Sequence, residues 1–156
     1  MRFFDINAEH VESFLRALRS GSPGGNVLLE VDEFFDPGID TPEQRSVILS
    51  DRLEQVIRKN YLDSRRQEGL SENLAEIKIE AFRQIAEDYA RGNADLEAWS
   101  VLYYRYIATI NASVDDLARA ANVVPQQLRR RLNLGLALLL RTLQQKALTS
   151  NPRVIE

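Results

Sequence analysis

The sequence predicts an all-α protein, in which a helical N-terminal part packs on a C-terminal helix-turn-helix module of three helices. Apolar residues recur at helical spacing through most of the 156-residue chain, and residues that begin or end helices stand between the periodic stretches. With 44% hydrophobic and 28% charged residues, the chain has enough apolar surface to bury a core. Extensive disorder is therefore excluded.

The first predicted helix follows Asn7, a favourable N-cap, and carries apolar residues at helical spacing. The Ser/Gly-rich stretch 20–26 ends it in a turn. Residues 27–31 are too few to show a period and fit either a short strand or a helical turn. Residues 32–40 are interpreted as an acidic loop, without the spacing of an EF-hand.

Three more helices are predicted from their caps. Thr41 is an N-cap followed by proline and a capping-box glutamine, and the apolar spacing behind it supports about five turns, up to a polar break at 65–69. Ser71 caps a further helix that ends at Gly92, and Asn93 caps the next. The aromatic stripe of this last helix is interpreted as core rather than as a base-stacking platform: Trp99, Tyr103 and Tyr106.

From residue 113 onward, the spacing of residue types becomes specific. Ser113 begins a capping box before a short helix over 114–121. Asn122, which tolerates a left-handed conformation, stands where the chain must turn sharply. Pro125 suits the first turn of a second helix, predicted over 125–133.

This stretch resembles a bacterial helix-turn-helix. Four positions carry the resemblance. Ala118 is the small residue where the two helices cross, and Asn122 stands at the turn position that is usually glycine. Val123 and Leu128 are the apolar residues beneath the turn and the recognition helix. Val124 stands where a serine or threonine commonly caps the second helix. With Arg131-Leu132 at its end and aromatic residues upstream, the chain is most similar to region 4 of sigma-70-type factors, over about residues 96–147. The resemblance implies that helix 125–133 contacts DNA.

Helical geometry orients this second helix. At about 100° per residue, a core-facing Leu128 brings four more leucines to its side of the helix. They are Leu132, Leu136, Leu139 and Leu143. The polar residues elsewhere on the helix are the candidates to contact base edges or phosphates. These DNA-binding candidates are Gln126, Gln127, Arg129, Arg130 and Asn133. Arg131 lies near the core edge, where it contacts either a backbone phosphate or another part of the protein.

The net charge of −3 is an average over two unlike parts. Residues 113–156 hold seven Lys/Arg and three Asp/Glu, which gives a net charge of +4. Residues 1–112 hold 13 Lys/Arg and 20 Asp/Glu, which gives a net charge of −7. A basic C-terminal third favours contact with phosphates. The sequence therefore predicts an acidic helical domain over 1–92, a helix-turn-helix module over 93–147 and a tail over 148–156.

The composition argues against an enzyme. The chain has no cysteine, and its single histidine, His10, allows no multi-histidine metal site. No nucleophile–base pair or carboxylate pair is distinguished by its spacing. We therefore expect no catalytic residue, no metal and no cofactor.

Two functions remain open. The leading hypothesis is a DNA-binding, transcription-regulatory protein that places helix 125–133 in a groove of duplex DNA. The alternative is a protein-interaction (docking) module of a larger multidomain regulator, with no DNA binding.

Leu134 and Leu138 form a second apolar face on the last helix. Packing on the N-terminal helices would cover it, and a contact with a second copy or a larger protein partner is the alternative. The longest apolar run, 134–140, is too short to span a membrane, and the N-terminus lacks the features of a signal peptide. We therefore expect no membrane contact and a cytoplasmic location.

Overall fold

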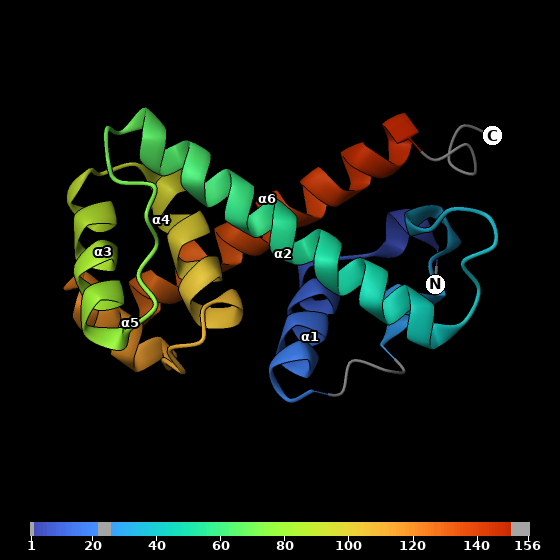
Figure 1. The fold of residues 1–156 in the computed structure, drawn as a ribbon, viewed down its shortest axis with the longest axis horizontal. Helices are drawn as coiled ribbons and strands as arrows, with labels where there is room; N and C mark the ends of the chain where they lie inside the picture. Colours follow the sequence, from blue (N-terminus) through green and yellow to red (C-terminus); the bar gives the residue numbers. More distant parts are fainter. Residues whose placement is uncertain (1, 22–25, 151–156) are drawn as a thin grey trace. The chain divides into compact units, whose positions relative to one another are not determined.

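A computed structural model describes residues 2–21 and 26–150 of the chain. These residues form helices and connecting turns without any strand, which confirms the all-α class (Figure 1). The helices are α1 (Ala8–Arg19), α2 (Pro42–Gln67), α3 (Lys78–Ala90), α4 (Ala94–Leu102), α5 (Val114–Ala121) and α6 (Pro125–Ser150). Shorter turns are the 3₁₀ turns η1 (Phe3–Asp5), η2 (Val27–Glu30) and η3 (Asp32–Phe34) and the π-helical turn η4 (Tyr103–Ile107).

The chain divides into two compact units. Unit 2 is the continuous segment Ile57–Gly135, and unit 1 combines the residues up to Val56 with those from Leu136 onward. Helices α2 and α6 each pass from one unit into the other. These bounds differ from the domain boundary expected at residue 92, since α3 packs against α4 and α5 within unit 2. Residues 22–25 of the predicted turn and 151–156 of the predicted tail lie outside the described part.

Unit 1 begins with the capped helix α1. The Asn7 side chain accepts a hydrogen bond from the His10 backbone N–H at 3.2 Å, and the His10 ring nitrogen Nδ1 accepts one from the Asn7 N–H at 3.1 Å, so the predicted N-cap is confirmed. Residues 27–30 form a 3₁₀ turn, which decides between the two alternatives left open by the sequence. The acidic stretch after it also supplies core, because Phe34 and Phe35 are buried.

Helix α2 starts as predicted, with Thr41 Oγ1 accepting a hydrogen bond from the Gln44 N–H at 3.2 Å. The helix has 26 residues and ends at Gln67, so the chain does break within the predicted range 65–69, although residues 65–67 are still helical. Arg65 is a fully buried helical residue, because its guanidinium forms an ion pair with the buried carboxylate of Asp88.

The helix predicted to be capped by Ser71 begins six residues later than expected, with Ile77 at the N-cap position and Lys78 as its first residue. Side chains of α2 and α3 hold the preceding segment in a non-helical conformation. Arg65 Nε donates to the Ser71 carbonyl at 2.6 Å, and Gln84 Nε2 donates to the Asn73 carbonyl at 2.7 Å. We call residues 71–77 the connecting segment.

The core of unit 2 includes the aromatic stripe of α4 and η4. Asn93 caps α4 as predicted, accepting hydrogen bonds from the N–H groups of the second and third helical residues. Trp99, Tyr103 and Tyr106 are all buried, which confirms their interpretation as core. The ring of Tyr61 from α2 stacks on Tyr103, with 5.2 Å between the ring centroids.

Candidate nucleic-acid interface

Helix α5 begins with a complete capping box, as its sequence predicts. Ser113 Oγ accepts a hydrogen bond from the Asp116 N–H, and the Asp116 carboxylate accepts one from the Ser113 N–H, both at 3.1 Å. The hydrogen bond from the Ser113 backbone, helped by the Arg119 guanidinium, holds the pKa of Asp116 below its usual value. Two orphan N–H groups are thereby satisfied, and the start of the helix is fixed.

A left-handed residue joins α5 to α6. Asn122 has φ +59° and ψ +44°, the conformation expected of it at this turn. The N–H of Val123 reaches back to the Ala118 carbonyl at 3.0 Å, which closes the end of α5. The chain then enters α6 at Pro125. Val124, the residue before it, has a side chain that is 62% exposed.

Helix α6 is anchored by one leucine face. The face predicted from the helical period is buried throughout: Leu128, Leu132, Leu136, Leu139 and Leu143. Gly135 lies against α4, where an added Cβ would be 2.8 Å from Leu102 Cγ and 2.9 Å from the Ala98 carbonyl oxygen. The helix continues to Ser150, well beyond the 125–133 range predicted for the recognition helix.

The structure exposes four of the five predicted DNA-binding side chains and half-buries the fifth. Those exposed are Gln126, Gln127, Arg130 and Asn133, and the half-buried one is Arg129. Arg131 contacts the protein itself, since its Nε lies 3.1 Å from Oε1 of Glu97, a residue only 6% exposed. Leu134 and Leu138 are half-buried.

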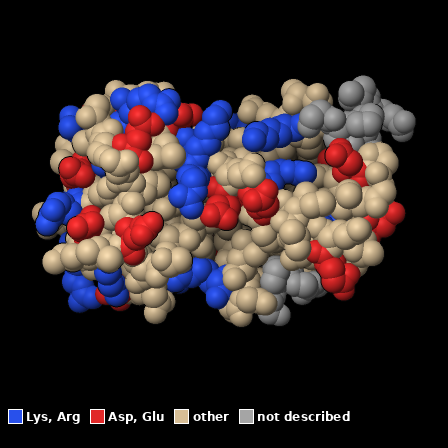
Figure 2. All heavy atoms as spheres, in the orientation of Figure 1, with Lys and Arg blue, Asp and Glu red and all other residues tan. Residues whose placement is uncertain are grey.

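The charges around this surface are mixed. Arg119 on α5 forms an ion pair with Asp116 at 2.8 Å, and Lys78 Nζ lies 4.0 Å from the same carboxylate. Figure 2 draws one face of the protein, and on this face, too, Lys and Arg side chains are interspersed with Asp and Glu. Arg130 is the basic residue of the predicted set that makes no hydrogen bond or ion pair with the described residues.

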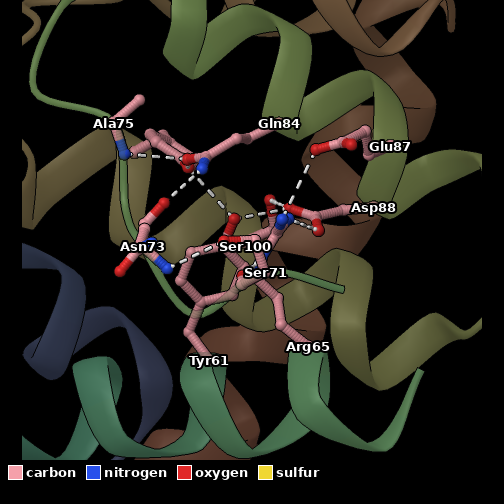
Figure 3. Close-up of polar contacts among 10 residues, drawn as sticks. Tyr61, Arg65, Ser71, Asn73, Ala75, Gln84, Glu87, Asp88 and Ser100 are labelled. Atoms are coloured by element: carbon pink, nitrogen blue, oxygen red, sulfur yellow. Dashed lines mark hydrogen bonds and ion pairs between the residues drawn. The ribbon is translucent and has the colours of Figure 1, made fainter. Parts of the chain in front are cut away.

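A buried polar cluster lies in the core of unit 2 (Figure 3). The Asp88 carboxylate accepts hydrogen bonds from Tyr61 Oη and Ser100 Oγ, each at 2.6 Å, besides its ion pair with Arg65. Burial raises the pKa of Asp88, and the hydrogen bonds from Ser100 and Tyr61 oppose that rise. Tyr61 Oη also lies 3.1 Å from Tyr104 Oη. The cluster joins α2, α3, α4 and η4.

Sequence reasoning missed this cluster. Its members come from three separate stretches of the chain, α2, α3 and the continuous α4–η4 stretch, and none of them stands in a motif. A weak signal was present in the i, i+4 spacing of Tyr61 and Arg65, which places an aromatic hydroxyl and a guanidinium on one face of α2.

The described residues contain neither a cluster of metal ligands nor a helix that could span a membrane. Within the ranges 2–21 and 26–150, no group of three or more histidine, aspartate or glutamate side chains is arranged to hold a metal ion. In the same ranges, no helix has the length and apolar character needed to cross a bilayer.

Comparison with known proteins gives no relative. No protein-family model, no curated protein and no solved structure matches the chain. The function is therefore inferred from the geometry.

Proposed function

We propose that the chain is a DNA-binding, transcription-regulatory protein that uses α5, the left-handed turn and the start of α6 as a helix-turn-helix. The observation that carries this proposal is the exposed polar surface of α6 directly after the turn. Arg130, Gln126 and Asn133 are exposed there, on a helix whose opposite side is fixed by buried leucines. A recognition helix needs this division between an anchored face and a polar face.

The expected contacts differ between the three consecutive arginines. Arg130 is available to a base edge or a phosphate. Arg131 is already held by Glu97, and Arg129 is half-buried. With few basic side chains available, affinity for duplex DNA should be low, and it should fall only gradually with added salt, because the salt dependence grows with the number of phosphates neutralised.

The test is a titration of the full chain with a random-sequence DNA duplex at two salt concentrations. Arg130→Ala should weaken binding severalfold and reduce the slope of log affinity against log salt by about one. Arg141→Ala is the matched control, because Arg141 is exposed on the same helix outside the predicted recognition stretch. Equal affinity of Arg130→Ala and wild type for every duplex would contradict the proposal.

A docking role is the second candidate, and the exposure of Val124 favours it. A large apolar side chain that is 62% exposed at the start of α6 suits a protein surface better than a phosphate backbone. The acidic side chains of Asp115 and Asp116 begin the neighbouring helix and would repel DNA. If this role is the correct one, wild-type protein will show no salt-dependent binding in the same titration.

A further inference from the structure

The connecting segment, residues 71–77, buries little of its own surface. Leu74 and Ala75 are half-buried and the other five residues are exposed, Ile77 by 55%. Figure 1 shows the segment as the green loop that leads from α2 to α3. Because few apolar contacts hold it, its attachment depends on hydrogen bonds. We therefore expect its local opening to cost less free energy than unfolding of the helices around it.

The connecting segment is also a wall that two hollows of unit 2 share. One hollow, of about 470 Å³, is lined on its other side by α3, including Glu80 and Gln84. The second, of about 500 Å³, is lined by residues of α2 and η4, including Arg58 and Tyr103. Residues 74–77 line both hollows. Displacement of the segment would therefore join them into one groove.

The first side chain that anchors the segment is Arg65, which reaches its start from the core. Arg65 Nε donates to the Ser71 carbonyl at 2.6 Å. The two terminal nitrogens of the same guanidinium form ion pairs with Asp88 and Glu87. Because a guanidinium is planar and its donors are fixed in direction, these ion pairs also aim the Nε–H bond. The buried polar cluster around Asp88 thus determines whether Ser71 is held.

The second anchor is Gln84, whose side-chain amide holds the middle of the segment (Figure 3). Its Nε2 donates to the Asn73 carbonyl at 2.7 Å, and its Oε1 accepts from the Ala75 N–H at 3.0 Å. The same Oε1 also accepts a hydrogen bond from Tyr104 Oη, which belongs to the buried polar cluster. That bond fixes the orientation of the amide, so the cluster reaches this anchor as well.

We propose that the connecting segment is a strap that opens locally, and that the buried polar cluster holds it closed through Arg65 and Gln84. Among the described residues, neither Asp88 nor Tyr104 is hydrogen-bonded to the segment itself. Both act through the anchor that they orient. When the anchors release the strap, the two hollows become one groove that extends from α3 to η4.

The test is amide hydrogen exchange of the full chain, wild type and Tyr104→Phe. In the wild type, Ala75 should exchange at least about tenfold faster than Ile85, in the middle of α3, because the strap opens without the helix. Tyr104→Phe removes the hydroxyl that orients Gln84 and leaves the segment unchanged. It should accelerate exchange at Ala75 about fivefold, the effect of one neutral hydrogen bond.

Tyr103→Phe is the matched control. It removes a hydroxyl from the neighbouring buried tyrosine, which makes no hydrogen bond to either anchor among the described residues. Exchange at Ala75 should keep its wild-type rate in this variant.

Cleavage by an endoproteinase that cuts after glutamate gives a second readout. The rate of cutting after Glu76 follows the population of the open strap, so it should rise about fivefold in Tyr104→Phe. Arg65→Lys tests the other anchor, since it keeps a positive charge near Asp88 and lacks the Nε–H that holds Ser71. Cutting after Glu76 should be faster in this variant too.

Two results would each overturn the inference: exchange at Ala75 as slow as at Ile85 in the wild type, or wild-type rates of exchange and cleavage in Tyr104→Phe. Neither measurement involves DNA, so the outcome is independent of the proposed helix-turn-helix function.

Discussion

The guanidinium of Arg65 on α2 and the carboxylate of Asp88 on α3 form an ion pair that is entirely withdrawn from solvent, with 2.5 Å between Nη1 and Oδ1. A buried charge that loses its partner is strongly destabilising. Together with the hydrogen bond from Tyr61 to the same carboxylate, this pair attaches α2 to α3 within unit 2.

Asp88→Asn should lower the free energy of unfolding by about 3 kcal/mol, because it removes the buried counter-charge of Arg65 and leaves only the half-exposed Glu87 carboxylate, 3.4 Å from Arg65 Nη2. Urea denaturation followed by circular dichroism measures the change. Glu72→Gln is the control, since it removes the partner of the exposed Arg66 one position along the chain, where water screens the charges. A loss of stability no larger for Asp88→Asn than for this control would show that the buried pair is dispensable.

Gln84→Ala should release the connecting segment, residues 71–77. The Gln84 amide accepts a hydrogen bond from the Ala75 N–H at 3.0 Å and donates one to the Asn73 carbonyl. Amide hydrogen exchange at Ala75 should become faster in the variant, because its N–H loses this acceptor. Gln67→Ala, at an exposed position at the end of α2, should leave that rate unchanged. An unaltered exchange rate in Gln84→Ala would mean that other contacts hold the segment.

The left-handed turn at Asn122 should discriminate between glycine and β-branched residues. Asn122→Gly should preserve or raise the melting temperature, whereas Asn122→Val should lower stability by about 1–2 kcal/mol, the cost of a side chain in this conformation. Asn133→Val, at an exposed helical position of α6, measures the general cost of valine in a helix. Thermal unfolding of the three variants measures these changes in stability. Similar losses of stability in Asn122→Val and Asn133→Val would contradict a special role of the turn.

Asp116 should make the stability of α5 and its capping box depend on pH in the acid range. Its pKa in the folded protein lies below the usual 3.8, so the unfolded chain binds the proton more readily. The stabilisation is therefore complete above pH 3.8 and is lost as the pH falls through the lowered pKa. Asp116→Asn should be less stable than wild type at neutral pH, and the difference should shrink at the lowest pH that the fold tolerates. Urea titrations at both pH values would reveal a constant difference if the carboxylate were not responsible.

Helix starts were predictable where they depend on neighbouring residues. The caps at Asn7, Thr41, Asn93 and Ser113 each use a side chain and N–H groups two or three residues away, so the sequence alone reveals them. The start predicted at Ser71 was wrong, because hydrogen bonds from side chains of α2 and α3 compete with helix formation there. Such partners are near in space and unmarked in the sequence.

The candidate interface shows the same limit. Helical period was enough to place Leu128 in the core and Arg130 in solvent. It left the partner of Arg131 open, because Glu97 stands 34 residues earlier in the chain.

The division of the chain has a consequence for the order in which the two units can fold. Unit 2 is one continuous segment, whereas unit 1 is complete only when the residues up to Val56 meet those from Leu136 onward. Closing the loop between these two segments costs chain entropy. Formation of unit 2 makes the intervening residues compact and so lowers this cost, which allows unit 2 to form before unit 1 is completed.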